Sequence, residues 1–317
     1  MAEPRASDPE NEAVSAAVGK SRKLAARIPR LILEARRVAS TVIHGMHGRR
    51  RAGSGENFWQ YRRFVNGEPS HNVDWRRSAR DDNLYVRERE WEASHTIWLW
   101  PDRSPSMDFT SALSEWSKLD RALVVSFALA EVLVQGGERV GIPDLMRPTA
   151  NSNIIEKMAR TIVHDTTEHP SLPPNFAPAP FSEVLLLSDF WSPIAEFRRI
   201  IGHLAANGAR GHVVQVVDPA EETFPYSGRV EFIESEGLGS VTAGRAETWR
   251  NDYQALLANH RAALRAECEQ FGWSFTVHRT DRGPTELLFA IHARMGAGAQ
   301  QTTVNSRHAP AQPRGAG

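Results

Sequence analysis

Several features are scarce or absent in this 317-residue sequence, and each absence excludes a class of protein. A single cysteine, Cys268, rules out an intrachain disulfide. The longest apolar stretch, residues 122–134, is interrupted by Glu131 and is too short to cross a bilayer, so it predicts a buried helix. The first residues lack the charged-then-apolar order of a secretory signal. We therefore expect a cytoplasmic protein with no transmembrane segment.

The chain also lacks an excess of charge of either sign, with 38 basic and 38 acidic residues. At 41% hydrophobic and 24% charged residues, it is an ordinary globular sequence that is long enough to bury a sizeable core. One main domain with appendages is the expected organisation. Both ends are polar or biased towards Gly, Ala, Gln and Pro, and we predict disorder for residues 1–18 and 296–317.

Positive charge is concentrated in residues 19–52, which we interpret as a basic amphipathic helical arm. Between Lys20 and Arg51, ten Lys or Arg residues accompany a single acid, Glu34. Two interpretations are open: a helix docked on the protein's own surface with a solvated basic face, or a helix that contacts an acidic partner, nucleic acid or anionic lipid. The helix is predicted from apolar residues that recur at intervals of three and four: Ile28, Leu31, Ile32, Ala35, Val38, Ala39 and Val42.

Strand and helix patterns alternate along residues 95–295, the predicted main domain. Such alternation implies an α/β fold, a doubly wound and mostly parallel sheet with helices on both faces. Cys268 and His260 lie on the apolar stripe of the long helix near residues 247–271, so we predict that they pack in or beside the core. The other helices are predicted near 117–135, 153–163, 195–206 and 286–294, and the strands at 95–100, 139–142, 183–187, 212–217 and 273–279.

The first of these strands ends in the loop Asp102-Arg-Ser104-Pro-Ser106, which has the composition of a metal site. In an extended turn alternate side chains point the same way, so Asp102, Ser104 and Ser106 can converge one carboxylate and two hydroxyls. Such hard oxygen ligands suit Mg²⁺ better than Zn²⁺, with Mn²⁺ and Ca²⁺ as alternative ions. A polar turn is the other interpretation. The end of a buried strand favours the metal site, because open α/β sheets place ligands there.

A second carboxylate, Asp189, follows another strand. Residues 184–187 are an uninterrupted apolar run, which is typical of a central parallel strand buried on both faces. Where the strand order of a sheet reverses, two strand ends meet at one crevice, so Asp189 is predicted to be a direct or water-mediated partner of the metal. The alternative is that Asp189 is a helix N-cap.

Asp102-x-Ser104-x-Ser106 after the first core strand, together with Asp189 after a later one, resembles the metal-ion-dependent adhesion site of von Willebrand factor A domains. The resemblance implies a von Willebrand A-like sheet. Domains of this type also use a Thr from a loop between the two motifs. Thr149 is the candidate for that ligand, with Thr166 and Thr167 as rivals.

A block upstream, within residues 53–94, looks like the bacterial domain-of-unknown-function 58 family, whose members carry it directly before such a strand and an Asp-x-Ser-x-Ser-Met loop. Two departures, Gly67-Glu68 in place of the usual Gly-Asp and His71 or Asn72 where the family has an Arg, put in doubt a charge-specific role for that turn. The block contains Gly53, Gly55, Glu56, Phe58, Arg62, Arg63, Phe64, Val73, Asp74, Trp75, Ser78, Ala79, Arg80 and residues 84–88.

The block mixes aromatic and Arg residues with a similar number of acids, which argues against a nucleic-acid groove. Two interpretations are open. One is a β-rich, ion-paired appendage packed on the main domain. The other is an interaction surface for another protein, since Arg and Trp anchor interfaces.

Taken with these resemblances, the residues predict a non-enzymatic, Mg²⁺-dependent protein-binding adaptor. In an adhesion-type site a carboxylate from the partner completes the metal coordination, and the family resemblance implies a MoxR-type AAA+ ATPase or its client as that partner, in a chaperone-like assembly or maturation system. One alternative is a metal-dependent phosphohydrolase with Asp102 as nucleophile. That enzyme lacks a second acid at Ser104, an identifiable Lys or general acid, and any nucleotide-binding loop. The other alternative is binding of nucleic acid or a membrane surface through the basic arm.

Overall fold

The structure is a computed structural model, and it describes residues 9–47, 60–65, 73–80, 83–88, 95–167, 169–235 and 239–305. The chain divides into two compact units. The larger combines Met1–His44 with His95–Gly317, and the smaller is Gly45–Ser94. Each unit is described by itself.

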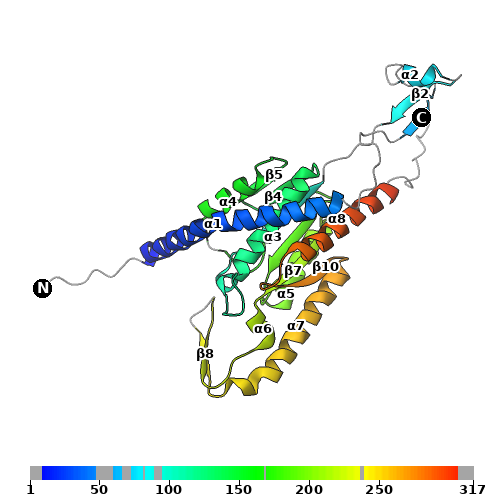
Figure 1. The fold of residues 1–317 in the computed structure, drawn as a ribbon. Coiled ribbons are helices and arrows are strands. Elements are labelled where there is room, and N and C mark those ends of the chain that lie inside the picture. Colours follow the sequence, from blue (N-terminus) through cyan, green and yellow to red (C-terminus); the bar gives the residue numbers. More distant parts are fainter. Residues whose placement is uncertain are drawn as a thin grey trace, which may run out of the picture. The chain divides into compact units, whose positions relative to one another are not determined.

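The larger unit contains a six-stranded sheet in the order β10-β7-β6-β3-β4-β5 (Figure 1). Five strands are parallel, and β5 runs antiparallel to β4 at one edge. This mixed α/β architecture with a mostly parallel central sheet confirms the predicted fold class at that level. The strands are β3 (Thr96–Pro101), β4 (Arg139–Ile142), β5 (Met146–Thr149), β6 (Glu183–Ser188), β7 (Arg210–Val217) and β10 (Ser274–Arg279).

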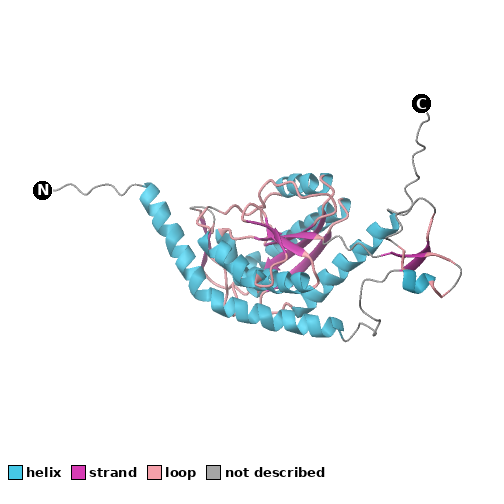
Figure 2. Cartoon of the chain, turned by 90° about the horizontal axis from the view of Figure 1, so that it is seen from above, coloured by secondary structure: helices cyan, strands magenta, loops and turns pink. Residues whose placement is uncertain are grey.

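Helices lie on both sides of the strands (Figure 2). On one face α5 (Ile194–Ala206) and α7 (Arg250–Gln270) pack on β6 and β7, where Cys268 is fully buried as predicted. On the other face α3 (Lys118–Gln135) contacts the central strands. Residues 118–130 of α3 are all buried, which explains the apolar composition of this helix on every side.

The arm helix α1 (Pro9–His47) lies against α3 and α4 (Ile154–His164), as Figure 1 shows. Most of its predicted apolar stripe is buried, with Ile28 and Ile32 half-buried. Arg27 and Arg36 form ion pairs with Asp120 and Glu156. In the structure this helix is therefore docked on the protein's own surface. Its basic residues Lys20, Arg22 and Lys23 are exposed.

The ends of the larger unit differ from the boundaries that the composition predicted. Helix α1 already begins at Pro9, inside the 1–18 segment, and α8 (Thr285–Asn305) continues past residue 296. Both extensions are rich in Ala, Glu or Gln, which are good helix formers. Within the described residues, no helix is long and apolar enough to cross a membrane.

Several short elements complete the larger unit. Helix α6 (Pro219–Thr223) follows β7, and a hairpin of β8 (Val230–Ile233) and β9 (Ser240–Ala243) lies between α6 and α7. Two 3-10 turns, η2 (Pro105–Asp108) and η3 (Ala246–Trp249), follow β3 and β9.

The smaller unit contains β1 (Gln60–Arg63) paired antiparallel with β2 (Tyr85–Glu88), and the short helix α2 (Trp75–Ser78). Asp74 caps α2 through the N–H of Arg77 and accepts a hydrogen bond from the Tyr61 hydroxyl at 3.2 Å. The Arg77 guanidinium lies 4.6 Å from the centre of the Tyr85 ring. Residues 53–58, 67–72 and 89–92 of the family block lie outside the described residues.

Candidate metal centre

The loops after β3 and β6 meet at the point where the strand order reverses. From β3 the chain continues to β4 on one side, and it later returns to β6 on the other side. The Asp102 N–H donates to the Leu187 carbonyl at 2.8 Å, so the two strand ends are joined directly. This is the position at which open α/β sheets hold ligands.

Asp102 is fully buried and held by neutral donors. The Ser104 N–H donates to its Oδ1 at 2.7 Å, and the Ser188 hydroxyl donates to its Oδ2 at 2.6 Å. The hydroxyl oxygens of Ser104 and Ser106 lie 3.2 Å apart. Ser104 is buried and Ser106 is half-buried. The structure therefore brings the three predicted loop residues together, with Ser106 nearest to solvent.

Burial raises the pKa of Asp102 to about 6. The hydrogen bonds from Ser188 and Ser104 act in the opposite direction, and the nearby charge of Asp189 raises the pKa further. The carboxylate has thus lost much of its hydration without gaining a positive partner of its own. A cation bound here would supply that partner.

Asp189 has a different environment, because it contacts a buried lysine. Its Oδ2 accepts a hydrogen bond from the Lys118 ammonium at 2.8 Å, and the same ammonium donates to Glu221 Oε1 at 2.7 Å. Lys118 and Asp189 are each 1% exposed. Among the described residues, the other oxygen of Asp189 accepts a long hydrogen bond of 3.4 Å, from the Trp191 N–H.

The electrostatic balance keeps Lys118 charged. Burial alone would lower the pKa of Lys118, but Asp189 and Glu221 outweigh it, so its pKa is raised. Burial also raises the pKa of Glu221 despite its contact with Lys118. Asp189 and Glu221 thus place two carboxylates on one ammonium, and the charge of Asp189 also acts on Asp102.

Neighbouring residues fix the backbone of this cluster. The buried Gln215 side chain donates to the Asp189 carbonyl at 2.9 Å. Asp218 caps α6 and accepts the hydroxyl of Ser111 at 2.5 Å, which ties down the loop before α3. Phe190, next to Asp189, has φ of +53°, a conformation that is costly for a residue with a side chain.

The donor set fits a hard divalent cation. Asp102, Ser104 and Ser106 offer a carboxylate and two hydroxyls, and Asp189 Oδ1 is the oxygen that Lys118 leaves free. Each Asp102 oxygen accepts one hydrogen bond and keeps a second lone pair. No group of three or more His, Cys, Asp or Glu side chains in the described part of the chain forms a metal cluster, so a site here depends on the serine hydroxyls.

Thr149 does not belong to this cluster. It ends β5 opposite Val140, and Val140 is paired with Ile97 near the start of β3. Asp102 is five residues further along β3, or roughly 16 Å at a strand's rise per residue. The prediction of Thr149 as a ligand is wrong, because β5 runs antiparallel to β4 and its last residue, Thr149, lies at the end of the sheet where β3 begins. Its rival Thr167 hydrogen-bonds Asp165, which pairs with Arg103 beside the loop.

Lys118 and Glu221 are the residues that the sequence did not reveal. We identified no suitably placed lysine in the sequence, yet Lys118 lies within hydrogen-bonding distance of Asp189. One signal was present: Lys118 follows the N-cap Ser117, at the positive end of a helix dipole where a cation is unfavourable without carboxylate partners.

The chain is similar to several known proteins. An uncharacterized protein of Mycobacterium tuberculosis and one of Mycobacterium bovis are each 27% identical over 280 residues, which is 82% of this chain and 86% of theirs. The crystal structure of the conserved hypothetical protein BatB from Bacteroides thetaiotaomicron covers 65% of this chain and all of its own, with 12% identity and a TM-score of 0.38. An aerotolerance-related membrane protein from Bacteroides fragilis covers 64% of this chain and all of its own, with 14% identity and a TM-score of 0.39.

The family model described as "Protein of unknown function DUF58" matches residues 60–263, more than half of the chain. The match begins in the smaller unit at β1 and includes the strand ends that carry Asp102 and Asp189. The matched residues include most of the block within residues 53–94 and the Asp102 loop, the two features that resemble this family. The chain belongs to the DUF58 family.

Proposed function

We propose that this chain is a non-enzymatic, Mg²⁺-dependent protein-binding module with a von Willebrand A-like fold. The observation that carries the proposal is the convergence of Asp102, Ser104, Ser106 and Asp189 at the switch point of the sheet. Asp189 and Glu221 share the one charge of Lys118, and the nearby Asp102 has no cationic partner, so an excess of negative charge remains that a divalent cation would neutralise. When bound, Mg²⁺ would present an open coordination position to a carboxylate of the partner protein.

The half-buried Ser106 is where a partner would approach, because Asp102, Ser104 and Asp189 are closed off from solvent. The choice of a MoxR-type AAA+ ATPase or its client as the partner, in a chaperone-like assembly system, rests on the family resemblance. Mn²⁺ or Ca²⁺ would suit the same oxygen donors.

The proposal is tested with the full chain and an Asp102→Ala variant. We expect Mg²⁺ to raise the unfolding temperature of the wild type and to leave that of Asp102→Ala unchanged, since a ligand stabilises only the state that binds it. Asp252→Ala, an exposed carboxylate on α7, is the matched control and should respond like the wild type. Partner capture should then require both Mg²⁺ and Asp102. Normal Mg²⁺ binding and partner capture by Asp102→Ala would contradict the proposal.

The phosphohydrolase alternative gains one residue, since Lys118 is a lysine near the site that could not be identified from the sequence. Lys118 is nevertheless occupied by two carboxylates, and both oxygens of the fully buried Asp102 accept hydrogen bonds. A nucleophile has to reach its substrate, so this geometry favours binding over catalysis.

Binding through the basic arm is the remaining alternative. Because α1 buries Leu31 and Val38, deleting it would expose core surface and confuse the result. Substitution of the exposed Lys20, Arg22 and Lys23 by Gln is the sharper test. We expect Mg²⁺-dependent capture to persist in that variant.

A further inference from the structure

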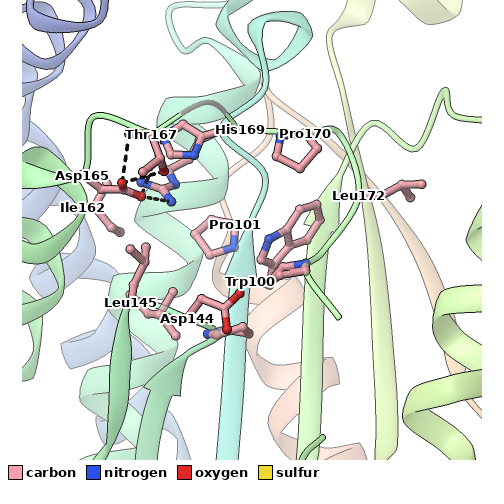
Figure 3. A pocket seen from close by; sticks show the side chains of 14 residues that line it. Trp100, Pro101, Asp144, Leu145, Ile162, Asp165, Thr167, His169, Pro170 and Leu172 are labelled. Atoms are coloured by element: carbon pink, nitrogen blue, oxygen red, sulfur yellow. Dashed lines mark hydrogen bonds and ion pairs between the residues drawn. The ribbon is translucent and has the colours of Figure 1, made fainter. Parts of the chain in front are cut away.

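A cavity of about 150 Å³ lies next to the Asp102 loop, lined by Pro101 and Arg103 but not by Asp189. Its walls come from the ends of β3 and β4 and from the connection after α4, as Figure 3 shows. Trp100 and Pro101 lie in the middle of the view, with Asp165, Thr167 and His169 gathered at one end and Asp144 at the other. The cavity therefore has an apolar middle and two polar ends.

The apolar part is well defined. Trp100, Ile142, Ile162 and Leu172 line the cavity and are all buried. A cavity of this size accepts a benzene-sized group. It is smaller than the roughly 300–1,000 Å³ that pockets for drug-sized ligands and cofactors occupy. The volume thus selects one ring or one branched aliphatic side chain.

One end of the cavity offers a hydrogen-bond donor. Arg103 Nη2 donates to Asp165 at 2.7 Å, whereas Arg103 Nη1 is buried and has no hydrogen-bond partner among the described residues. A buried donor without an acceptor is costly, so an occupant that supplies an acceptor is favoured.

The charges at the cavity favour a neutral acceptor over an anion. Asp165 already balances the charge of Arg103. Burial, followed by the charge of Arg103, lowers the pKa of His169 to about 4, so His169 is neutral at pH 7. The exposed Asp144 carboxylate at the other end would repel an anion and accept a hydrogen bond from an N–H group.

We propose that this cavity binds one apolar, ring-sized side chain of a peptide segment from a partner protein, with a main-chain carbonyl of that segment on Arg103 Nη1. A peptide carries the required acceptor, donor and apolar group on adjacent atoms. The exposed residues Asp144, Thr167 and Pro170 form the rim through which the segment enters. The pocket does not depend on the proposed metal centre.

The test uses blocked amino acids as probes on the full chain in EDTA, so that the metal centre plays no part. Saturation-transfer NMR titrations compare N-acetyl-phenylalaninamide, N-acetyl-alaninamide and N-acetyl-phenylalanine with its free carboxylate. We expect the first to bind with a Kd on the order of 1 mM, as its size allows. The alanine probe should bind at least about tenfold more weakly, because it buries no ring. The free acid should also bind more weakly than the amide.

Two variants locate the binding. Arg103→Lys keeps a cation for Asp165 but removes the second nitrogen, and it should weaken the phenylalaninamide about fivefold, the worth of one hydrogen bond. Leu145→Trp should fill the cavity and abolish binding. Arg245→Lys and Leu113→Trp, at exposed positions elsewhere, are the matched controls and should bind as the wild type does.

Equal binding of the phenylalanine and alanine probes, or full affinity in Arg103→Lys, would overturn the proposal. If Leu145→Trp does not fold, as judged by circular dichroism, Arg103→Lys decides the question alone. Because all titrations are made in EDTA, failure here leaves the metal proposal standing, and loss of Mg²⁺ binding in Asp102→Ala leaves this one standing.

Discussion

Asp102 and Asp189 occupy equivalent places at the ends of adjacent parallel strands, yet their surroundings are opposite. Both are buried to within 1% of full exclusion from solvent. Asp102 is held by a backbone N–H and a serine hydroxyl, whereas Asp189 is held by the Lys118 ammonium. One carboxylate is thus solvated by neutral dipoles and the other by a fixed cation.

The difference teaches how a fold can hold two carboxylates at one point without a metal. A nearby negative charge raises the pKa of a carboxyl group, as Asp189 does for Asp102. Lys118 neutralises one of the two and leaves the other to take up a proton or an external cation. Asp102 is therefore the carboxylate whose charge state we expect to change with pH or with a bound cation.

The largest expected effect comes from removing the Lys118 ammonium, which is what distinguishes Asp189 from Asp102. Lys118→Met leaves Asp189 and Glu221 buried without their positive partner. Breaking a buried ion pair from one side costs about 3–5 kcal/mol, so we expect a loss of that order in the free energy of unfolding. Urea denaturation followed by circular dichroism in EDTA measures it.

The double variant Lys118→Met, Asp189→Asn is the control for that experiment. It also removes one of the two carboxylates left without a cation, with Glu221 remaining, and it should recover part of the lost stability if the loss of pairing is the cause. An exposed ion pair contributes up to about 1 kcal/mol. A loss of stability below that value in Lys118→Met would show that Lys118, Asp189 and Glu221 do not behave as a buried ion-paired group.

The Asp102 half is probed by pH. The pKa of Asp102 is about 6 in the folded protein, against about 3.9 for a free carboxyl. Between these values the native state holds the proton and the unfolded state does not, so the contribution of Asp102 to stability falls as pH rises from about 4 to 6. The fall amounts to roughly 3 kcal/mol.

The measurement is a difference between the wild type and Asp102→Asn in EDTA. The difference is needed because the pKa values of His169 and His278 are lowered to about 4, which makes stability rise with pH in the same window. Mg²⁺ should make the fall in stability between about pH 4 and 6 smaller, because a bound cation favours the ionised form of Asp102 and so lowers its pKa. A pH-independent difference between the two proteins would mean that Asp102 ionises normally.

Much of the fold could be predicted from the sequence, because local signals were strong. The uninterrupted apolar run of residues 184–187 marks a central strand, and Ser117 and the pair Gly136-Gly137 delimit α3. The convergence of Asp102 with Asp189 followed from one rule about strand ends. The strand and helix signals depend on residues that are close in sequence, and the strand-end rule then relates two distant strands.

The missed features depend on residues that are far apart or on weak strands. Lys118 is 71 residues from Asp189 and 103 from Glu221, and no local pattern links them. Strand β5 contains Pro148, which is tolerated only at an edge, so its sequence resembles a turn. Because β5 was not predicted, the sequence did not show that Thr149 lies at the end of the sheet away from Asp102.

An exposed ion pair tests whether the stability lost in Lys118→Met comes from burial of the charges or from pairing alone. Arg36 and Glu156 join α1 to α4 through an ion pair whose side chains are 57% and 38% exposed. Arg36→Met should cost less than about 1 kcal/mol in the same urea measurement, because water and salt screen the pair. A cost similar to that of Lys118→Met would mean that pairing itself, rather than burial, sets the stability of both regions.

The smallest expected effect concerns Thr149, which lies on β5, two strands from β3, at the end of the sheet where β3 begins rather than where Asp102 lies. Thr149→Val keeps the shape of the side chain, suits an edge strand and removes only the hydroxyl. Calorimetric titration with Mg²⁺ should give the same affinity as the wild type within about twofold, since the hydroxyl is roughly 16 Å from the loop along the strand direction. Ser106→Ala, which removes a hydroxyl from the cluster itself, should weaken Mg²⁺ binding by about tenfold or more. The reverse order would place the cation away from the Asp102 loop and remove the reason for treating Asp102 and Asp189 as two halves of one centre.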